Sequence, residues 1–599
     1  MQLARDHSVH PSCLALRLMK VHSAIQAAAY GATLRGNEVD FRVWAPKPKE
    51  VVLRLMRAGR QPVDISMHRE GEDFVVTAAA QVGDRYAYVL DGSPPIPDPV
   101  SRFLPDGVHG PTEIVDPSLY SWSDGGWRGL PLEDYVIYEL HIGTFTPEGT
   151  LDSAMQKLQY LKDLGITVVE IMPVSATPGR RNWGYDGVSP YAVQANYGGP
   201  AAFRRFVDAA HELGLAVILD VVYNHFGPEG NYLRMFGPYF TSHHKTPWGD
   251  AINYDDRGSE HVRRYVIGNA LFWIREYHLD GLRLDAVQTI KDDSPTHILA
   301  EIQENVQKLA ANLNRTVVVI AETDENDSRY IKSQPVGYGL NAVWSDDFHH
   351  ALHAFVTGER TGYYQDFGQP EQIAKALRDG YVFQGEHFAF WKAARGTRAK
   401  DVPLPTNVIC IQNHDQAGNR AKGERLTQLI PRGARKLAAA LLLLAPHTPL
   451  LFMGQEYDEH APFQFFADFG DPELKKAVSE GRRNEFKDFD FNDVPDPEDP
   501  RTFERSKLTW ADAPEDRDML DWYRKLLELR KRYVLGHERR ASVTYQDGVL
   551  TMQVPAINPT LRVEAGLERD AKLLPQSSNW KEILRSDEDG YVVRILTSS

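Results

Sequence analysis

The first patterned stretch of the chain, from about residue 37 to residue 90, consists of short runs of β-branched, aromatic and leucine residues. Glycine, proline and aspartate separate these runs at intervals typical of a β-sandwich. The runs lie at residues 41–44, 51–55, 74–76 and 86–90. They predict a small all-β domain at the N-terminus. The Pro- and Gly-rich segment 94–117 is expected to connect this domain to the rest of the chain.

From about residue 134, apolar runs of strand length alternate with amphipathic stretches of helix length. The apolar runs lie at residues 135–140, 168–172, 215–222, 279–284, 317–321, 342–344, 408–411 and 450–453, and the helical stretches include 151–164, 203–213, 260–277 and 432–444. Such alternation is typical of parallel strands with crossover helices. Eight units over about 400 residues predict a (β/α)8 TIM barrel with long inserted loops. A doubly wound sheet is the alternative, but no G-x-G-x-x-G motif opens a helix here.

The C-terminal part of the chain changes pattern once more. A charged amphipathic helix is predicted at residues 520–533, followed by β runs at 542–545, 549–554 and 591–595. The predicted fold class is therefore α/β, a barrel flanked by two β domains. The predicted division is an extension at 1–30, a β-sandwich at 31–110, the barrel at 111–533 and a C-terminal β domain at 534–599.

Composition narrows the class of protein. The chain of 599 residues is 42% hydrophobic and 25% charged, which is typical of a globular protein and argues against wholesale disorder. A net charge of −15 and the lack of a basic stripe argue against a nucleic-acid partner. Cys13 and Cys410 form neither a disulfide framework nor a zinc-binding spacing. No apolar run has the length of a membrane span. We therefore expect a cytoplasmic monomer without a membrane partner.

The fourth predicted barrel strand ends in a carboxylate. Asp285 follows the apolar run 279–284, and Arg283 lies two residues before it. Residues i and i+2 of a strand point to the same face, so both side chains should project from the end of this strand. An arginine at that distance keeps a carboxylate ionised and orients its oxygens, as a carboxylate nucleophile requires. A purely structural ion pair would produce the same pattern.

Polar residues also end three other predicted strands. The third strand leads to Asp220 and His225, the fifth to Glu322, and the seventh to His414 and Asp415. In a TIM barrel these strand ends meet at the face that holds the active site. Glycoside hydrolysis needs one ionised and one protonated carboxyl group. Glu322 has no arginine next to it in the sequence, and apolar surroundings would keep it protonated. A hard-cation site is the alternative, which the arginine disfavours.

Together, segments 220–225, 281–285 and 413–415 and residue Glu322 resemble the four sequence regions of the α-amylase family of glycoside hydrolases. The resemblance covers roughly residues 110 to 530. Segment 41–46 is similar to the β-sandwich that precedes the barrel in isoamylases and branching enzymes. The resemblance implies a retaining hydrolase in which Asp285 is the nucleophile, Glu322 is the general acid/base, and Asp415 binds sugar hydroxyls.

The same resemblance implies further contacts to substrate. These would come from Arg283, His225, His414, Asp220 and Tyr185, the last as the platform for the sugar ring at the cleavage point. In α-amylases the residue matching Asn224 binds calcium. The rest of that calcium site is not found in this sequence, so neither a metal nor a cofactor is expected.

Four segments outside the shared regions indicate the branch of the family. Residues 246–253, 462–468, 471–474 and 480–486 resemble the maltooligosyltrehalose trehalohydrolases. Those enzymes hydrolyse the α-1,4 bond next to a terminal trehalose, which implies maltooligosyltrehalose or a maltooligosaccharide as substrate. Aromatic faces suit stacking on sugars, so Trp248, Phe463 and Phe465 are predicted substrate contacts. An aromatic mini-core that holds the loop would show the same composition.

Gln288 and Thr289 stand where many α-amylases have Lys-His, so the subsites for the leaving group are expected to differ.

Two alternative functions stay open. A glucan branching enzyme, or another α-1,4/α-1,6-glucan hydrolase, would share the same barrel and the same covalent step. A non-catalytic binding subunit is disfavoured because such relatives lose a catalytic acid, whereas Asp285, Glu322 and Asp415 are all present.

Overall fold

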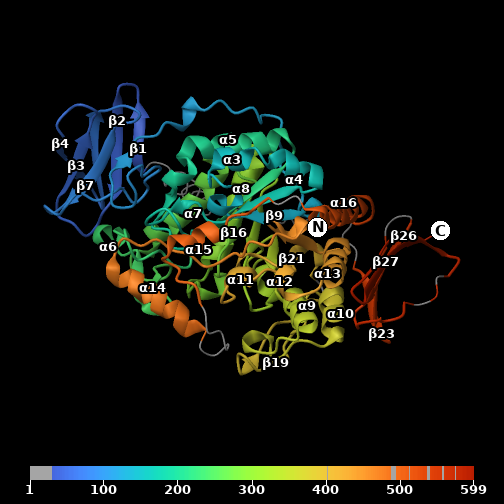
Figure 1. Ribbon diagram of the computed structural model, residues 1–599. Coiled ribbons are helices and arrows are strands. Elements are labelled where there is room, and N and C mark those ends of the chain that lie inside the picture. The colour runs from blue at the N-terminus through green and yellow to red at the C-terminus, as the bar shows by residue number, and fades with distance from the viewer. Residues whose placement is uncertain are drawn as a thin grey trace, which may run out of the picture.

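The computed structural model describes residues 30–400, 402–486, 494–510, 513–535, 540–555, 559–573, 575 and 577–598 (Figure 1). Figure 1 shows three parts in a row, with the N-terminal β-sheets at one end, the barrel in the middle and the C-terminal sheet at the other end. The predicted extension 1–30 lies outside the described residues except for Tyr30, and Cys13 lies outside them as well. No helix among the described residues is long and apolar enough to cross a membrane.

The N-terminal part consists of two four-stranded antiparallel sheets. The first has the order β1 (Gly31–Arg35), β2 (Glu38–Trp44), β6 (Asp73–Ala79) and β5 (His68–Glu70); the second has β4 (Val63–Ser66), β3 (Val51–Met56), β7 (Arg85–Leu90) and β8 (Thr112–Glu113). Every second residue of β3 is buried, as strand alternation requires. All four runs predicted from the sequence form strands here.

Eight parallel strands close into a barrel. In chain order they are β9 (Ile137–Leu140), β10 (Val168–Ile171), β13 (Ala216–Val221), β16 (Gly281–Leu284), β17 (Val318–Ala321), β18 (Ala342–Trp344), β21 (Asn407–Cys410) and β22 (Thr448–Phe452). Each corresponds to one predicted run, so the predicted TIM barrel is confirmed. Pairing of β13 with β16 sets Asp220 opposite Arg283, near the C-terminal ends of both strands.

Helices cover the outside of the barrel (Figure 1). The longer ones are α5 (Gly199–Glu212), α7 (Ser259–Glu276), α8 (Ile298–Leu313), α9 (Asp347–Thr357), α10 (Pro370–Asp379), α13 (Arg432–Leu444), α14 (Pro472–Glu485) and α16 (Pro514–Tyr533). The predicted helix 151–164 is in fact two, α3 (Leu151–Met155) and α4 (Leu158–Leu164). The last predicted helix begins six residues earlier than expected, with a proline in its first turn, where a missing N–H costs nothing.

Short elements make up the loops at the barrel mouth and the segments between the larger helices. They are α2 (Ile142–Phe145), α6 (Leu233–Phe236), α11 (His414–Gly418), α12 (Leu426–Leu429), α15 (Pro500–Arg505) and the strand pairs β11 (Ser175–Ala176) with β12 (Ser189–Val193), β14 (Phe240–Thr246) with β15 (Gly249–Ile252), and β19 (His387–Phe388) with β20 (Ala393–Ala394). The β14–β15 hairpin belongs to the long loop after β13.

The C-terminal sheet has five antiparallel strands. Their order is β23 (Ser542–Gln546), β24 (Val549–Val554), β25 (Leu561–Gly566), β27 (Tyr591–Ser598) and β26 (Trp580–Glu588). The sequence analysis predicted three of them and missed β25 and β26. β26 is an edge strand without a buried residue, so its pairing with β27 leaves no apolar pattern in the sequence. The exact domain boundaries at residues 110 and 533 stay predictions.

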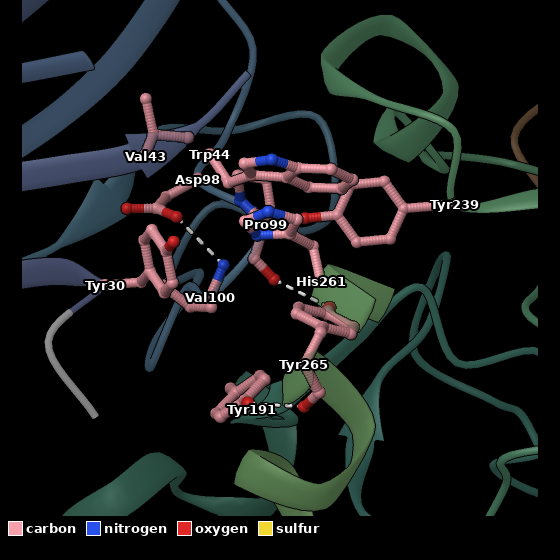
Figure 2. A pocket seen from close by; sticks show the side chains of 10 residues that line it. All are labelled: Tyr30, Val43, Trp44, Asp98, Pro99, Val100, Tyr191, Tyr239, His261 and Tyr265. Carbon is pink, nitrogen blue, oxygen red and sulfur yellow. Dashed lines mark hydrogen bonds between the residues drawn. The ribbon is translucent and has the colours of Figure 1, made fainter. Parts of the chain in front are cut away.

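Aromatic rings pack the N-terminal domain against α7 (Figure 2). Trp44 stacks on His261 of α7, with ring centroids 4.6 Å apart and planes 10° apart. The Tyr265 hydroxyl, also from α7, donates to the Pro99 carbonyl over 2.8 Å. The cavity among these rings measures about 20 Å³, enough for roughly one water molecule. This cavity is therefore part of a packed seam between the two domains and has no room for a sugar.

Candidate active site

Arg283 lies at the centre of the residues that the sequence analysis selected. Its side chain is fully buried, and Nη1 donates to both oxygens of Asp220, over 2.9 and 2.8 Å. The same nitrogen donates to Asp285 Oδ1 over 2.7 Å. The guanidinium also lies over the ring of Trp344, 4.3 Å from its centroid. Charge-assisted hydrogen bonds of this kind are the strong ones, so one arginine orients two carboxylates at the mouth of the barrel.

Asp285 is held on both sides. Besides Arg283, the Asn224 side-chain N–H donates to Asp285 Oδ2 and to the Asp285 carbonyl, each over 2.7 Å. The next residue, Ala286, has a left-handed backbone with φ of 40° and donates its N–H to Glu322 Oε2 over 2.5 Å. A non-glycine residue in this region needs support from its surroundings, and such residues cluster at active sites.

Glu322 differs from Asp285 in its surroundings. Burial raises the pKa of the Glu322 carboxyl well above its usual value, and the charges of Asp285 and Asp415 raise it further while Arg283 opposes them. The sequence analysis placed no arginine beside Glu322, but Arg283 Nη2 lies 3.6 Å from Glu322 Oε2. That contact is too long for a hydrogen bond, and Nη2 has no other hydrogen-bond partner among the described residues. The raised pKa favours the protonated form of the Glu322 carboxyl group.

His414 is the charged histidine of the site. Burial lowers its pKa, but the charges of Asp415 and Glu139 and a hydrogen bond to Glu139 outweigh burial and raise the pKa to about 9. Its backbone N–H donates to Glu139 Oε2 over 2.9 Å, and Nδ1 donates to Glu139 Oε1. Nε2 lies 2.8 Å from the Tyr185 hydroxyl, which itself donates to Asp220 over 2.6 Å. A doubly protonated imidazole satisfies all of these bonds.

Asp415 and Tyr185 keep surfaces open to the barrel mouth. The Asp415 side chain is 38% exposed, lies 3.4 Å from His414 Nε2 and accepts from Asn419 over 3.3 Å. The Tyr185 ring is half-buried and stacks on His414, with centroids 5.3 Å apart and planes 21° apart. The structure thus brings together seven of the predicted residues, which are Tyr185, Asp220, Arg283, Asp285, Glu322, His414 and Asp415.

His225 and Trp248 extend the site on the side of β13. Their rings stack 4.1 Å apart with planes 6° apart, and Trp248 is 49% exposed, so its outer face is open. Burial lowers the pKa of His225, which keeps that ring neutral. His225 Nδ1 donates to the Asn224 side-chain oxygen. Asn224 therefore links the His225 ring to Asp285.

The prediction that Phe463 contacts sugar is wrong. Phe463 is fully buried, stacks on Trp183 at 5.1 Å and meets Phe452 edge-on at 5.0 Å. A ring covered on its faces cannot stack on a sugar, so Phe463 is a packing residue beneath the site. Phe465 is half-buried and lies edge-on to Trp183 at 5.2 Å, with the Arg482 guanidinium 5.3 Å from its centroid.

Three acidic residues escaped the sequence analysis. Glu139 on β9 and Glu170 on β10 are almost fully buried inside the barrel, and Asp346 follows β18. Burial raises the pKa of Asp346 to about 7 and that of Glu170 well above its usual value, and no described residue forms a hydrogen bond to either oxygen of Glu170. The signal that could have found the two glutamates is a carboxylate in the middle of an apolar strand, which is unusual unless the group is paired or protonated.

Comparison with known proteins identifies relatives over most of the chain. The family profile described as "Alpha amylase, catalytic domain" matches residues 121–248. A malto-oligosyltrehalose trehalohydrolase from Saccharolobus solfataricus is 46% identical over 88% of this chain and 91% of its own length. One from Rhizobium sp. (strain M-11) is 48% identical over 82% of this chain and 84% of its own length. A 1,4-alpha-glucan branching enzyme from Vibrio parahaemolyticus is 37% identical, but over only 29% of this chain and 25% of its own.

Solved structures share the fold of this chain. A crystal structure of a Salmonella typhimurium protein assigned to the alpha amylases is 40% identical, with a TM-score of 0.88 over 95% of this chain and all of that chain. A pullulanase from Anoxybacillus, solved with maltotetraose, shares the fold at 19% identity, with a TM-score of 0.69 over 95% of this chain and 87% of that chain. The chain therefore belongs to the malto-oligosyltrehalose trehalohydrolase family, within the α-amylase family of glycoside hydrolases.

Proposed function

We propose that this protein hydrolyses the α-1,4-glucosidic bond next to the terminal trehalose of maltooligosyltrehalose and releases trehalose, by a retaining double displacement. Relatives named for this activity are about 45% identical over most of the chain, which supports the substrate. The observation that carries the chemistry is the contrast between two carboxyl groups around one guanidinium. Asp285 accepts a charge-assisted hydrogen bond from Arg283, whereas Glu322 accepts none from it and has a raised pKa.

In the first step Glu322 acts as general acid. Its proton passes to the glycosidic oxygen as Asp285 attacks the anomeric carbon, so the bond to trehalose breaks while a glycosyl–Asp285 ester forms. Loss of that proton leaves Glu322 charged. Arg283 Nη2, which has no hydrogen-bond partner within the part of the chain that the structure describes and lies 3.6 Å away, stabilises the new carboxylate without any large movement.

In the second step Glu322 acts as general base. It takes a proton from a water molecule, the water oxygen attacks the anomeric carbon, and Asp285 leaves as a carboxylate. Two inversions give net retention. Retaining enzymes keep the two carboxyl groups about 5–5.5 Å apart. Contact of both groups with one guanidinium, and the hydrogen bond from Ala286 N–H to Glu322, support such a close pair.

The remaining residues are proposed to bind the sugar. Asp415 would accept from sugar hydroxyls, the Tyr185 ring would carry the sugar at the cleavage point, and the open face of Trp248 would stack on a neighbouring sugar. His225, which contacts Asn224, and His414, which contacts Tyr185, would help to position the sugar and the nucleophile. The functional unit is proposed to be a monomer, because all of these side chains come from one chain. A cytoplasmic location stays a prediction.

Product analysis with two parallel substrates tests the function. Maltooligosyltrehalose should release free trehalose from the first turnover, with kcat/KM about a hundredfold higher than for a maltooligosaccharide of equal length. That ratio corresponds to ~2.7 kcal/mol of differential transition-state binding, within reach of two or three selective hydrogen bonds. Equal kcat/KM for both substrates, or accumulation of branched glucan, would replace this proposal with the branching-enzyme alternative.

A further inference from the structure

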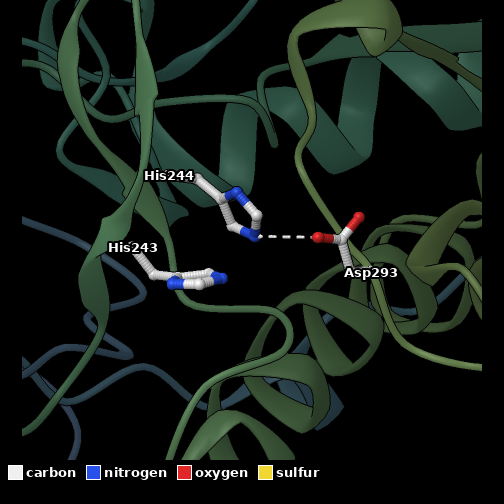
Figure 3. A group of neighbouring side chains, drawn as sticks. All are labelled: His243, His244 and Asp293. Atoms are coloured by element: carbon white, nitrogen blue, oxygen red, sulfur yellow. Dashed lines mark ion pairs between the residues drawn. The ribbon is translucent and has the colours of Figure 1, made fainter.

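Two adjacent histidines lie beside an aspartate from a different loop (Figure 3). His243 and His244 belong to β14, and Asp293 lies in the loop that follows β16. One possible ligand atom from each of the three residues lies within 4.8 Å of the others. His244 Nε2 is 3.8 Å from Asp293 Oδ2. Nothing in the proposed hydrolysis uses this group.

A break in the β14–β15 hairpin brings the two histidine rings together. Neighbouring residues of a regular strand point to opposite faces, which would separate the rings. The ladder breaks after Thr241, which pairs with Ala251, and resumes at Lys245, which pairs with Asp250. Residues 242–244 have no partners on β15, and such bulges re-aim side chains. The two ring centroids lie 4.5 Å apart.

Asp255 adds a buried carboxylate to the group. Its side chain is 7% exposed, and Oδ2 accepts from His244 Nε2 over 2.7 Å and from the Asp293 backbone N–H over 2.8 Å. Its other oxygen, Oδ1, is buried and has no hydrogen-bond partner among the described residues. Buried polar atoms are normally paired, so this oxygen, on the carboxylate that contacts His244, is available to a cation.

The donor set determines the class of ion. Imidazole nitrogens together with carboxylate oxygens suit zinc and similar transition metals, whereas calcium and magnesium take oxygen ligands. Zinc is tetrahedral and lies about 2.0–2.2 Å from such atoms, so two ligands of one ion are about 3.4 Å apart. The observed limit of 4.8 Å therefore requires side-chain movements of up to about 1.4 Å. The exposed His243 and the 83% exposed Asp293 side chain can rotate by that amount.

We propose a binding site for one zinc-class ion, which fastens the β14–β15 hairpin to the loop after β16; its ligands are His243, His244, Asp255 and Asp293. The sequence analysis expected no metal because the rest of the α-amylase calcium site is not found in the sequence, and it did not consider these histidines. The hairpin carries Trp248 in its turn, and that ring stacks on His225. A bound ion would therefore fix one wall of the sugar-binding face, whether or not the leaving group is trehalose.

Zinc binding by the intact protein tests the site. After equilibrium dialysis against a zinc salt alone, wild type should hold one ion more per chain than a His243→Ala/His244→Ala variant. The matched control is His68→Ala/His387→Ala, which removes two exposed strand histidines elsewhere and should bind zinc as wild type does. Equal zinc content in wild type and in the His243→Ala/His244→Ala variant overturns the proposal.

Two further measurements separate the site from a folding defect. Asp293→Asn changes an exposed side chain and should weaken zinc binding at least tenfold without altering the unfolding temperature of the zinc-free protein. Hydrogen exchange of residues 240–252 should slow on zinc addition in wild type but not in the double-histidine variant. Zinc binding that leaves hydrogen exchange in residues 240–252 unchanged would refute the proposal that the ion fastens this hairpin. Zinc binding by Asp293→Asn as tight as that of wild type would refute the proposed ligand set. Neither readout depends on hydrolytic activity.

Discussion

Replacing Glu322 by glutamine should separate proton donation from every other property of the site. Glutamine has the same shape, and its side-chain oxygen can still accept the Ala286 N–H. It cannot give a proton to the glycosidic oxygen, and general acid catalysis contributes about 10²–10⁴-fold in rate. We expect kcat on maltooligosyltrehalose to fall by that factor, which is about 2.7–5.5 kcal/mol of barrier.

A substrate with a good leaving group isolates the role of the proton. A glycosyl fluoride leaves without protonation, so the Glu322→Gln variant should form the covalent intermediate from it at close to the wild-type rate. The matched control is Glu325→Gln, an acid three residues further along that contacts Tyr330 and Arg329 and should retain activity on both substrates. Equal losses on the fluoride and on the natural substrate would refute Glu322 as the acid.

The same substitution should raise the free energy of unfolding, by an amount that depends on pH. Burial raises the folded-state pKa of Glu322 above its unfolded value of about 4.5, so the folded protein binds more protons than the unfolded chain above that pH. Wild type therefore loses stability as pH rises from about 4.5 towards the folded pKa, by at most about 1.4 kcal/mol per pH unit. Glu322→Gln lacks this penalty. The variant should unfold at a higher denaturant concentration at pH 6.5, and the difference should vanish near pH 4. An unchanged difference across this range would contradict a protonated Glu322.

Three other substitutions give separate tests. Asp285→Ala should reduce kcat to near background. The product first released by wild type should be the α-anomer by NMR, and a β-anomer would contradict retention. Glu139→Gln removes the charge that helps hold the pKa of His414 near 9, so the alkaline limb of the kcat/KM profile should move to lower pH, and an unmoved limb would exclude this positioning role. Phe463→Ala should cost about 3–5 kcal/mol in the free energy of unfolding, as for a core aromatic, while the substrate preference of the protein that remains folded should not change.

Strand ends were predictable from the sequence because apolar runs followed by polar residues mark them directly. All eight barrel strands were found in this way, including the short β18. The partners of Arg283 were predicted only in part. Its bond to Asp285 follows from i, i+2 spacing, whereas its bonds to Asp220 depend on the register between β13 and β16, which no local pattern encodes.

The sequence analysis was wrong about Phe463 and missed Glu139 for the same reason, which is that both depend on contacts between residues far apart in the chain. An aromatic loop over a barrel mouth has the same composition whether its rings face substrate or each other, and only the covering of Phe463 by Trp183 and Phe452 decides between these. Glu139 was read as part of an apolar run because its partner His414 is far away in the sequence. Long-range pairs of this kind require the fold.

The aromatic seam between the N-terminal domain and α7 makes the two parts interdependent in folding. Trp44 covers His261, and the Pro99 carbonyl accepts a hydrogen bond from the Tyr265 hydroxyl, so a barrel without the N-terminal domain would expose both rings of α7 to water. The same helix leads directly into β16, which carries Arg283. Heat should therefore unfold the sandwich and the barrel in a single cooperative transition, and removal of the sandwich should disorder the strand that presents the nucleophile.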